Sequence, residues 1–151
     1  MSMLNGHVRR ILHVEDNPGD VCLIGEALGE SGRGYEIVVA PDGADALDYL
    51  YGRGNYAGAP RPDLILLDLN LPKKTGREVL AELKKDAALK HIPVVVFTSS
   101  SAPLDISEAY GLHANCYVTK PADLDEVFRV VGMIEAFWLG AVKLPTSSRE
   151  L

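Results

Sequence analysis

The chain lacks several features that mark particular classes of protein, and each absence narrows its function. Two cysteines, Cys22 and Cys116, stand in no CxxC pair, which excludes a disulfide framework and a structural zinc site, and we expect both to be small buried side chains. Against 21 Asp and Glu there are 15 Lys and Arg, so the formal net charge is −6 and a basic stripe for nucleic acid is absent. No apolar run approaches the roughly 18 residues of a membrane span, and no signal-peptide core follows the N-terminus. We therefore expect a cytoplasmic protein that binds neither nucleic acid nor membrane.

The length and composition are those of one globular domain. The chain has 151 residues, of which 47% are hydrophobic and 24% charged. This length provides one buried core and rarely divides into two domains. We expect a folded domain at residues 8–139 and a C-terminal tail at residues 140–151, which is too short to form a DNA-binding output module.

Short apolar runs alternate five times with amphipathic segments along the chain. We predict strands at residues 11–14, 35–40, 64–68, 93–98 and 116–119, and helices at residues 18–28, 44–51, 76–85, 102–110 and 123–139. Residues 52–62 are rich in Gly and Pro and are predicted to form an exposed, structureless loop. The alternation predicts an α/β fold with right-handed crossovers and a parallel sheet covered on both faces.

Four of the five predicted strands end in side chains able to take part in chemistry. Glu15 and Asp16 follow the first strand, Asp68 ends the third, Thr98 the fourth, and Lys120 follows the fifth. Because the carboxyl ends of parallel strands meet at one edge of a sheet, we expect these groups to share a crevice. Carboxylates crowded together repel one another unless a cation lies among them, and Mg²⁺ prefers oxygen ligands. The set would suit the stabilisation of a phosphoryl group in transfer.

The segments Val14-Glu15-Asp16-Asn17 and Lys120-Pro121, with Asp68 and Thr98 between them, resemble the signature of the receiver domain of two-component response regulators. Their joint occurrence in this order is specific, although each feature alone is common. The similarity covers roughly residues 8–139 and implies a flavodoxin-like fold, a doubly wound five-stranded parallel sheet in the order 2-1-3-4-5 with five helices. Residues 61–72, 115–117 and 137–139 are similar to single-domain regulators paired with bacterial phytochrome histidine kinases.

The resemblance implies a nucleophile and a metal site. Asp68 would accept a phosphoryl group from a phosphohistidine of a sensor histidine kinase and form an aspartyl phosphate. Asp16, Asp68 and the backbone carbonyl of Asn70 would hold Mg²⁺, with Glu15 in an outer role. Glu15 stands where the family more often has Asp, and its extra methylene moves the carboxylate.

The resemblance also implies a switch. Thr98 would bond a phosphoryl oxygen, and Lys120 would pair with the phosphoryl group and, before it arrives, with Asp68. Tyr117 occupies the aromatic switch position, and its ring would turn inward when Thr98 moves towards the phosphate. Asn70 and Ser100 would tune the lifetime of the phosphate. The peptide bond after Lys120 is suggested to be cis.

The last predicted helix carries more apolar residues than one buried stripe needs. Val130, Ile134 and Phe137 lie on a flank that a lone domain would leave exposed to water. This pattern indicates self-association, and we predict a homodimer through the fourth helix, the fifth strand and the fifth helix.

Two other classes of function stay open. A Mg²⁺-dependent phosphohydrolase could use Asp68 as its nucleophile, but it needs a second catalytic acid where Asn70 stands. A flavin- or nucleotide-binding domain needs an anion-binding loop after the first strand, where Glu15 and Asp16 would repel a phosphate. We expect a phosphoacceptor that assists its own phosphorylation and dephosphorylation, and not an enzyme with a separate substrate.

Overall fold

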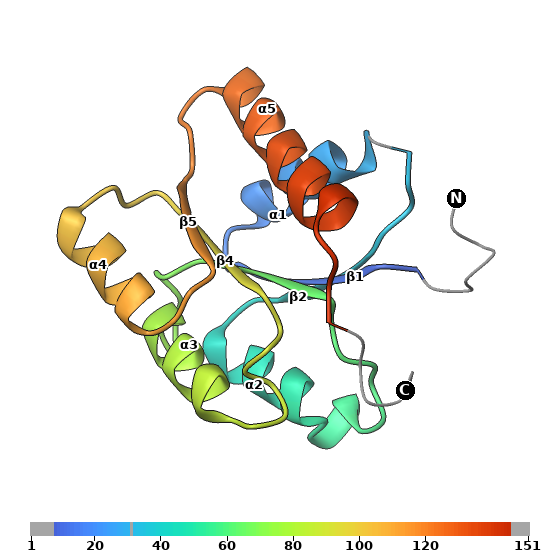
Figure 1. Cartoon of the computed structure of the whole chain (residues 1–151), viewed down its shortest axis with the longest axis vertical. Helices are drawn as coiled ribbons and strands as arrows, with labels where there is room; N and C mark the ends of the chain where they lie inside the picture. Colours follow the sequence, from blue (N-terminus) through green and yellow to red (C-terminus); the bar gives the residue numbers. More distant parts are fainter. Residues whose placement is uncertain (1–7, 31, 146–151) are drawn as a thin grey trace.

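A parallel five-stranded sheet forms the centre of the computed structural model, which describes residues 8–30 and 32–145 (Figure 1). The strands are β1 (Arg10–Val14), β2 (Glu36–Ala40), β3 (Leu64–Leu67), β4 (Val94–Thr98) and β5 (Cys116–Thr119). Their order is β2-β1-β3-β4-β5, which confirms the predicted topology. In β1, His13 lies opposite Val39 of β2 and Leu66 of β3.

Helices cover both faces of the sheet, as the predicted doubly wound fold requires (Figure 1). They are α1 (Pro18–Gly29), α2 (Gly43–Tyr51), α3 (Gly76–Lys85), α4 (Pro103–Gly111) and α5 (Leu124–Ile134). In Figure 1, α1 and α5 lie on one side of the sheet, and α2, α3 and α4 lie on the other. None of the helices in residues 8–30 and 32–145 has the length and hydropathy of a membrane-spanning segment.

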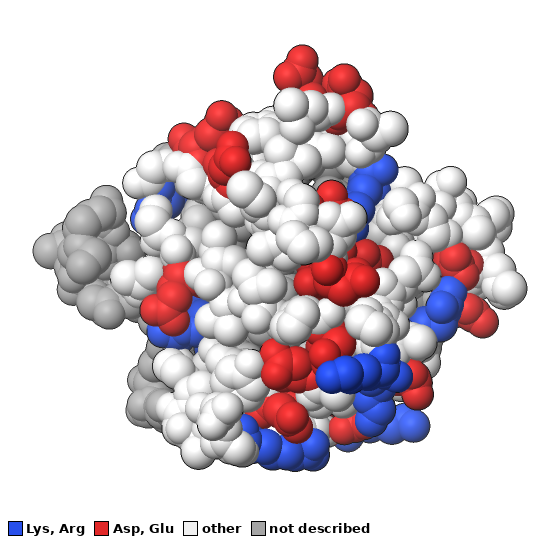
Figure 2. All heavy atoms as spheres, turned by 180° about the vertical axis from the view of Figure 1, so that it is seen from behind, with Lys and Arg blue, Asp and Glu red and all other residues white. Residues whose placement is uncertain are grey.

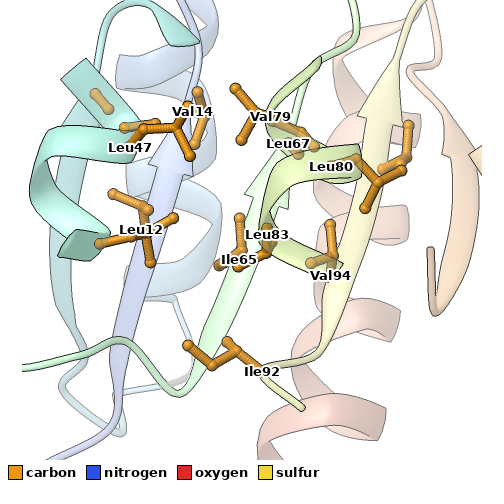
Figure 3. Close-up of a cluster of buried hydrophobic side chains, with 14 of the residues drawn as sticks. Leu12, Val14, Leu47, Ile65, Leu67, Val79, Leu80, Leu83, Ile92 and Val94 are labelled. Carbon is orange, nitrogen blue, oxygen red and sulfur yellow. The ribbon is translucent and has the colours of Figure 1, made fainter. Parts of the chain in front are cut away.

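The core has two layers because successive side chains of a strand point to opposite faces. In β3, Leu64 and Leu66 pack in the layer under α1 and α5, and Ile65 and Leu67 pack in the other layer. Figure 3 shows the second layer, in which Leu83 of α3 lies against the strands. All four residues of β3 are at most 2% exposed, so the continuous apolar run follows from burial on both faces.

Capping residues determine where the helices begin after the strands. The side chain of Asn17 accepts hydrogen bonds from the backbone N–H groups of Gly19 (2.9 Å) and Asp20 (3.2 Å), and Pro18 occupies the first turn of α1. Thr75 forms a capping box at the start of α3. The start of α1 is therefore held directly beyond the two acids that follow β1.

The segment at residues 52–62 is more ordered than predicted. It contains a short 3₁₀ turn, η2 (Gly54–Tyr56), and two tyrosines tie it to α2. The Tyr56 hydroxyl donates to Asp45 (2.8 Å), and the Tyr49 hydroxyl donates to the carbonyl oxygen of Pro60 (2.6 Å). The two rings also meet edge to face, with centroids 5.3 Å apart. The prediction of a structureless loop was wrong because it ignored these aromatic contacts.

Four further expectations need correction. The last helix does not continue unchanged to residue 139, because α5 ends at Ile134 and a π-helical segment, η3 (Glu135–Ala141), follows. Ile134 is only 6% exposed and belongs to the core, since α5 packs against α1.

Among the described residues no peptide bond is cis, so the suggested cis bond after Lys120 is wrong. Cys22, expected as a small buried side chain, is exposed. The tail at residues 140–151 lies partly outside the described residues, and the domain bounds stay predictions.

Candidate phosphoryl-transfer site

The predicted site residues meet at the carboxyl edge of the sheet. Backbone pairing continues beyond the strands: the amide of Asp68 donates to the carbonyl of Val14 (3.1 Å), and the amide of Lys120 donates to that of Thr98 (2.7 Å). The amide of Glu15 donates to the carbonyl of Ala40 (3.0 Å). These hydrogen bonds extend the sheet to the residues that carry the chemistry, so rigid backbone positions them.

Asp68 is buried, and both oxygens of its carboxylate accept hydrogen bonds. Its Oδ1 accepts from the Thr98 hydroxyl (2.8 Å) and from the backbone N–H of Asn70 (3.1 Å). Its Oδ2 accepts from the Lys120 ammonium (3.1 Å). Thr98 is fully buried, which keeps its hydroxyl aimed at Asp68. The carboxylate is therefore oriented before any ligand binds.

Lys120 lies among three carboxylates. Its Nζ donates to Oε1 of Glu15 (2.6 Å), Oδ2 of Asp20 (3.0 Å) and Oδ2 of Asp68 (3.1 Å). An ammonium has three N–H groups, so these contacts use its whole donor capacity. Two of the three partners were expected from the sequence or the resemblance to lie close by, and Asp20 was not.

Three acids lie close enough together to share a metal ion. One carboxylate oxygen from each of Glu15, Asp16 and Asp68 lies within 4.8 Å of the others. Glu15 is buried, whereas Asp16 is exposed. Such oxygens fit a hard divalent cation that keeps some of its water. Asn70 is exposed and its amide contacts Asp68, but no contact locates its carbonyl as a ligand.

The charges of the site are unbalanced in favour of the acids. Burial raises the pKa of Glu15 to about 7, although its hydrogen bond with Lys120 and that ion's charge oppose the rise. Burial disfavours the ammonium of Lys120, but its bonds to Glu15 and Asp20 outweigh this and raise its pKa. Figure 2 shows acidic side chains near the middle of one face and also at its top, with basic ones mostly below and to the right. An added cation would offset part of the negative charge of these carboxylates and favour the ionised form of Glu15.

His13 of β1 lies near the site but is neutral at pH 7. It is only 3% exposed, and burial lowers its pKa to about 4, with the charge of Lys120 acting in the same direction. His13 is therefore a buried, neutral side chain of the sheet.

Gly76 lets α3 approach the site closely. A Cβ atom at this position would lie 2.2 Å from the carbonyl oxygen of Asp68 and 2.6 Å from Cα of Leu69. Both are backbone atoms that cannot move aside without displacing Asp68. The start of α3 is thus packed directly against the loop that presents the aspartate.

Tyr117 of β5 is hydrogen-bonded to Ser100, which lies on the loop that follows β4. The half-buried Tyr117 donates its hydroxyl proton to the carbonyl oxygen of Ser100 (2.8 Å), and the Ser100 hydroxyl donates to Asp105 (2.5 Å). Arg77 of α3 completes the cluster through ion pairs with Asp105 and Glu108 (3.0 Å to the latter). The structure therefore links the loop after Thr98 to both α3 and α4.

Sequence reasoning missed Asp20 and Arg77. Asp20 lies in the first turn of α1, where an acid is common because it interacts favourably with the helix dipole. Arg77 lies in the first turn of α3, where a basic residue carries no comparable pattern. The one available signal was the short spacing between Asp16 and the start of α1, which places Asp20 near the same edge.

A parallel sheet in the order β2-β1-β3-β4-β5, with two acids, an aspartate, a threonine and a lysine at the ends of its strands, defines the receiver class of signalling protein. The chain matches the response regulator receiver domain over residues 11–132, and it belongs to that family.

Relatives and solved structures agree with this assignment. Response regulator Rcp1 of Synechocystis sp. is 50% identical over 137 residues, which cover 91% of this chain and 93% of Rcp1. The probable methanogenesis regulatory protein FilR2 of Methanothrix harundinacea is 41% identical over 135 residues, covering 89% of this chain and 86% of FilR2.

Among crystal structures, the phosphorylated cyanobacterial phytochrome response regulator RcpA superposes with a TM-score of 0.90 at 54% identity, covering 93% of this chain and all of RcpA. The Mn²⁺-bound form of Rcp1 superposes with a TM-score of 0.88 at 49% identity, covering 91% of this chain and 99% of Rcp1. The predicted fold and the predicted similarity to phytochrome response regulators are thereby confirmed.

Proposed function

We propose that this receiver accepts a phosphoryl group from a histidine kinase on Asp68, with Mg²⁺ bound beside it. One observation carries the proposal: Asp68 is held by Thr98 and Lys120 while Glu15 and Asp16 lie within metal-ligand range of its carboxylate. The group that these residues surround can act as a nucleophile, because it is oriented and faces both a lysine and a cation site.

The reaction joins an oxygen of Asp68 to phosphorus and breaks the phosphorus–nitrogen bond of a phosphohistidine, whose imidazole leaves with the electron pair. Thr98 donates its hydroxyl proton to a phosphoryl oxygen in place of Asp68 Oδ1, and Lys120 supplies a positive charge to the same group. Both donors already lie 2.8 and 3.1 Å from Asp68, so small displacements bring them to the phosphoryl oxygens.

The donor set fits Mg²⁺. Glu15, Asp16 and Asp68 offer hard oxygen atoms on one side of Asp68, and Lys120 lies beside Glu15 and Asp68. When bound, the cation neutralises negative charge on the phosphoryl group and its donor. Burial raises the pKa of Glu15, and a cation beside this carboxylate would favour its ionised form, which makes the group suited to such a ligand set.

The signal passes through Thr98 and Tyr117 to the α4–β5–α5 face. In the structure Thr98 already contacts Asp68, and the Tyr117 hydroxyl contacts the loop between Thr98 and α4. A shift of Thr98 towards a phosphoryl oxygen therefore moves the segment that holds the Tyr117 ring. Asn70 and Ser100, beside Asp68 and Thr98, set the lifetime of the phosphate.

We assign a phytochrome histidine kinase as the phosphodonor. The support is the similarity of this chain to Rcp1 and to the phytochrome response regulator RcpA over nearly their whole lengths. A cytoplasmic location and the lack of contact with nucleic acid or membrane stay predictions.

The exposed face formed by α4, β5 and α5 is proposed to pair with a second copy of the chain. Met133 of α5 (57% exposed) and Phe137 of the adjoining η3 (56%) border a shallow depression of about 290 Å³, and Leu104 of α4 is 68% exposed. Phe137→Glu should give a monomer in sedimentation velocity, and Val39→Glu, on the far edge strand, should not. An unchanged mass for Phe137→Glu would contradict the dimer.

Phosphorylation is tested with Mg²⁺ and either acetyl phosphate or a labelled kinase, followed by intact-mass spectrometry. The wild-type chain should gain one hydroxylamine-labile phosphoryl group, and Asp68→Asn should gain none. Asp125→Asn, an exposed acid of α5, serves as the matched control and should be labelled normally. Label retained in Asp68→Asn would refute the proposal, and turnover of many equivalents of a phosphate ester would favour the hydrolase alternative.

A further inference from the structure

We infer that Asp20 is a positioning residue for Lys120: it holds one N–H of the ammonium so that another points at the phosphoryl acceptor. The inference rests on the proposed phosphorylation of Asp68 and goes beyond the residues that the receiver resemblance assigns. It follows from the contact between Asp20 Oδ2 and Lys120 Nζ (3.0 Å), which joins residues 100 positions apart.

The geometry around the ammonium supports this role. The N–H groups of an ammonium point in three directions, and those of Lys120 meet Glu15, Asp20 and Asp68. With two directions occupied by Glu15 and Asp20, the third is determined. A lysine side chain has four rotatable bonds, so without such contacts its ammonium would sample several positions.

Asp20 is itself well placed to hold a partner. Its backbone N–H donates to the Asn17 side chain (3.2 Å), so the cap of α1 fixes its backbone. Its side chain is 35% exposed, whereas Lys120 is 12% exposed and Asp68 9%. Asp20 therefore reaches in from the rim of the site while the other two groups lie deeper.

The contact persists through the proposed reaction. Once Asp68 carries a phosphoryl group, the third N–H of Lys120 turns to a phosphoryl oxygen, and the bonds to Glu15 and Asp20 stay in place. Neither Asp20 nor Glu15 changes its covalent state, so the two acids act as a fixed support for the moving contact.

A simpler role for Asp20 is interaction with the dipole of α1, which any first-turn acid provides. That role needs no contact with Lys120. It also predicts that Asp20→Asn and Asp20→Ala behave alike, since both substitutions remove the negative charge at the start of α1.

The test compares Asp20→Asn with Asp20→Ala, which carry the same charge but differ in having an acceptor for Lys120. The measurement is the rate constant of phosphorylation by acetyl phosphate at saturating Mg²⁺, followed by intact mass. We expect Asp20→Asn to stay near or above the wild-type rate, and Asp20→Ala to be about tenfold slower than Asp20→Asn, the loss expected for one hydrogen bond to a charged group. Asp125→Ala, at a first-turn acid of α5, should leave the rate unchanged.

Equal rates for Asp20→Asn and Asp20→Ala would overturn the inference, because charge or helix stability alone would then explain the residue. The inference would also be overturned if the affinity for Mg²⁺, measured by calorimetry, fell more in Asp20→Ala than in Asp20→Asn. Asp20→Ser, too short to reach Lys120, replaces the alanine variant if thermal melting shows that the latter unfolds. A different result would contradict the proposed function itself: phosphoryl labelling that is retained in Asp68→Asn.

Discussion

The affinity of the site for Mg²⁺ should depend on pH near neutrality, because of Glu15. Burial raises the pKa of this carboxyl to about 7 in the metal-free protein. A cation bound beside Glu15 favours its ionised form, so binding must displace the proton from the fraction of molecules that carry it. Affinity therefore rises with pH, and the effect spans the range around pH 7.

The magnitude follows from the pKa. The apparent dissociation constant is multiplied by 1 + 10^(pKa − pH), which is about 11 at pH 6 and about 1.1 at pH 8. Mg²⁺ should thus bind about tenfold more weakly at pH 6 than at pH 8, a difference of about 1.4 kcal/mol in binding free energy. A glutamate with the usual pKa of 4.5 would be ionised at both values and give no change. His13, with a pKa of about 4, stays neutral throughout this range.

Isothermal titration calorimetry with Mg²⁺ at pH 6, 7 and 8 measures this dependence. Titrations at pH 7 in two buffers of different ionisation enthalpy should show about half a proton released per ion. Glu15→Gln keeps the size of the side chain but does not titrate, so its affinity should be nearly constant with pH. A pH-independent affinity in the wild-type chain, or an equal dependence in Glu15→Gln, would refute the reasoning.

Three predictions concern stability. Leu83→Ala removes a fully buried leucine and should lower the free energy of unfolding by about 2–5 kcal/mol in urea denaturation; a loss under about 1 kcal/mol would contradict its place in the core. Gly76→Ala forces a Cβ against the carbonyl of Asp68 and should lower both stability and Mg²⁺ affinity, whereas Gly132→Ala, which meets nothing within 4 Å, should stabilise the chain by up to about 1 kcal/mol. The reverse ranking in thermal melts would count against the close approach. Asn17→Ala removes the cap of α1 and should cost about 1 kcal/mol in the same denaturation assay, and no measurable cost would mean that the cap is not needed.

Much of the fold could be predicted because its signals are local. The apolar run at residues 64–67 indicated a strand buried on both faces, and that is where β3 lies. Gly, Pro and capping residues marked the helix ends to within a few positions. Prediction failed at residues 52–62, where Tyr49 and Tyr56 order the segment through contacts with residues outside it, and at Ile134, whose burial depends on packing between α1 and α5.

The site shows the same division. The positions of Glu15, Asp16, Asp68, Thr98 and Lys120 at strand ends followed from the alternation of strands and helices, since parallel strands present their carboxyl ends at one edge. Which of these side chains contact one another could not be predicted from the sequence, because hydrogen bonds depend on ångström-scale distances between loops. Asp20 illustrates this: its residue type and helix position suggest an ordinary first-turn acid.

By itself, then, the order of residues determined the topology, the chemical groups gathered at one edge of the sheet and the family to which the chain belongs. Only the folded arrangement decided that Lys120 bonds to three acids, that Glu15 is buried enough to shift its pKa, and that Tyr117 is joined to Ser100. The physical reason is range. Strand and helix signals act over a few neighbouring residues, whereas burial and ion pairing join residues up to about a hundred positions apart, where only tertiary packing sets distance.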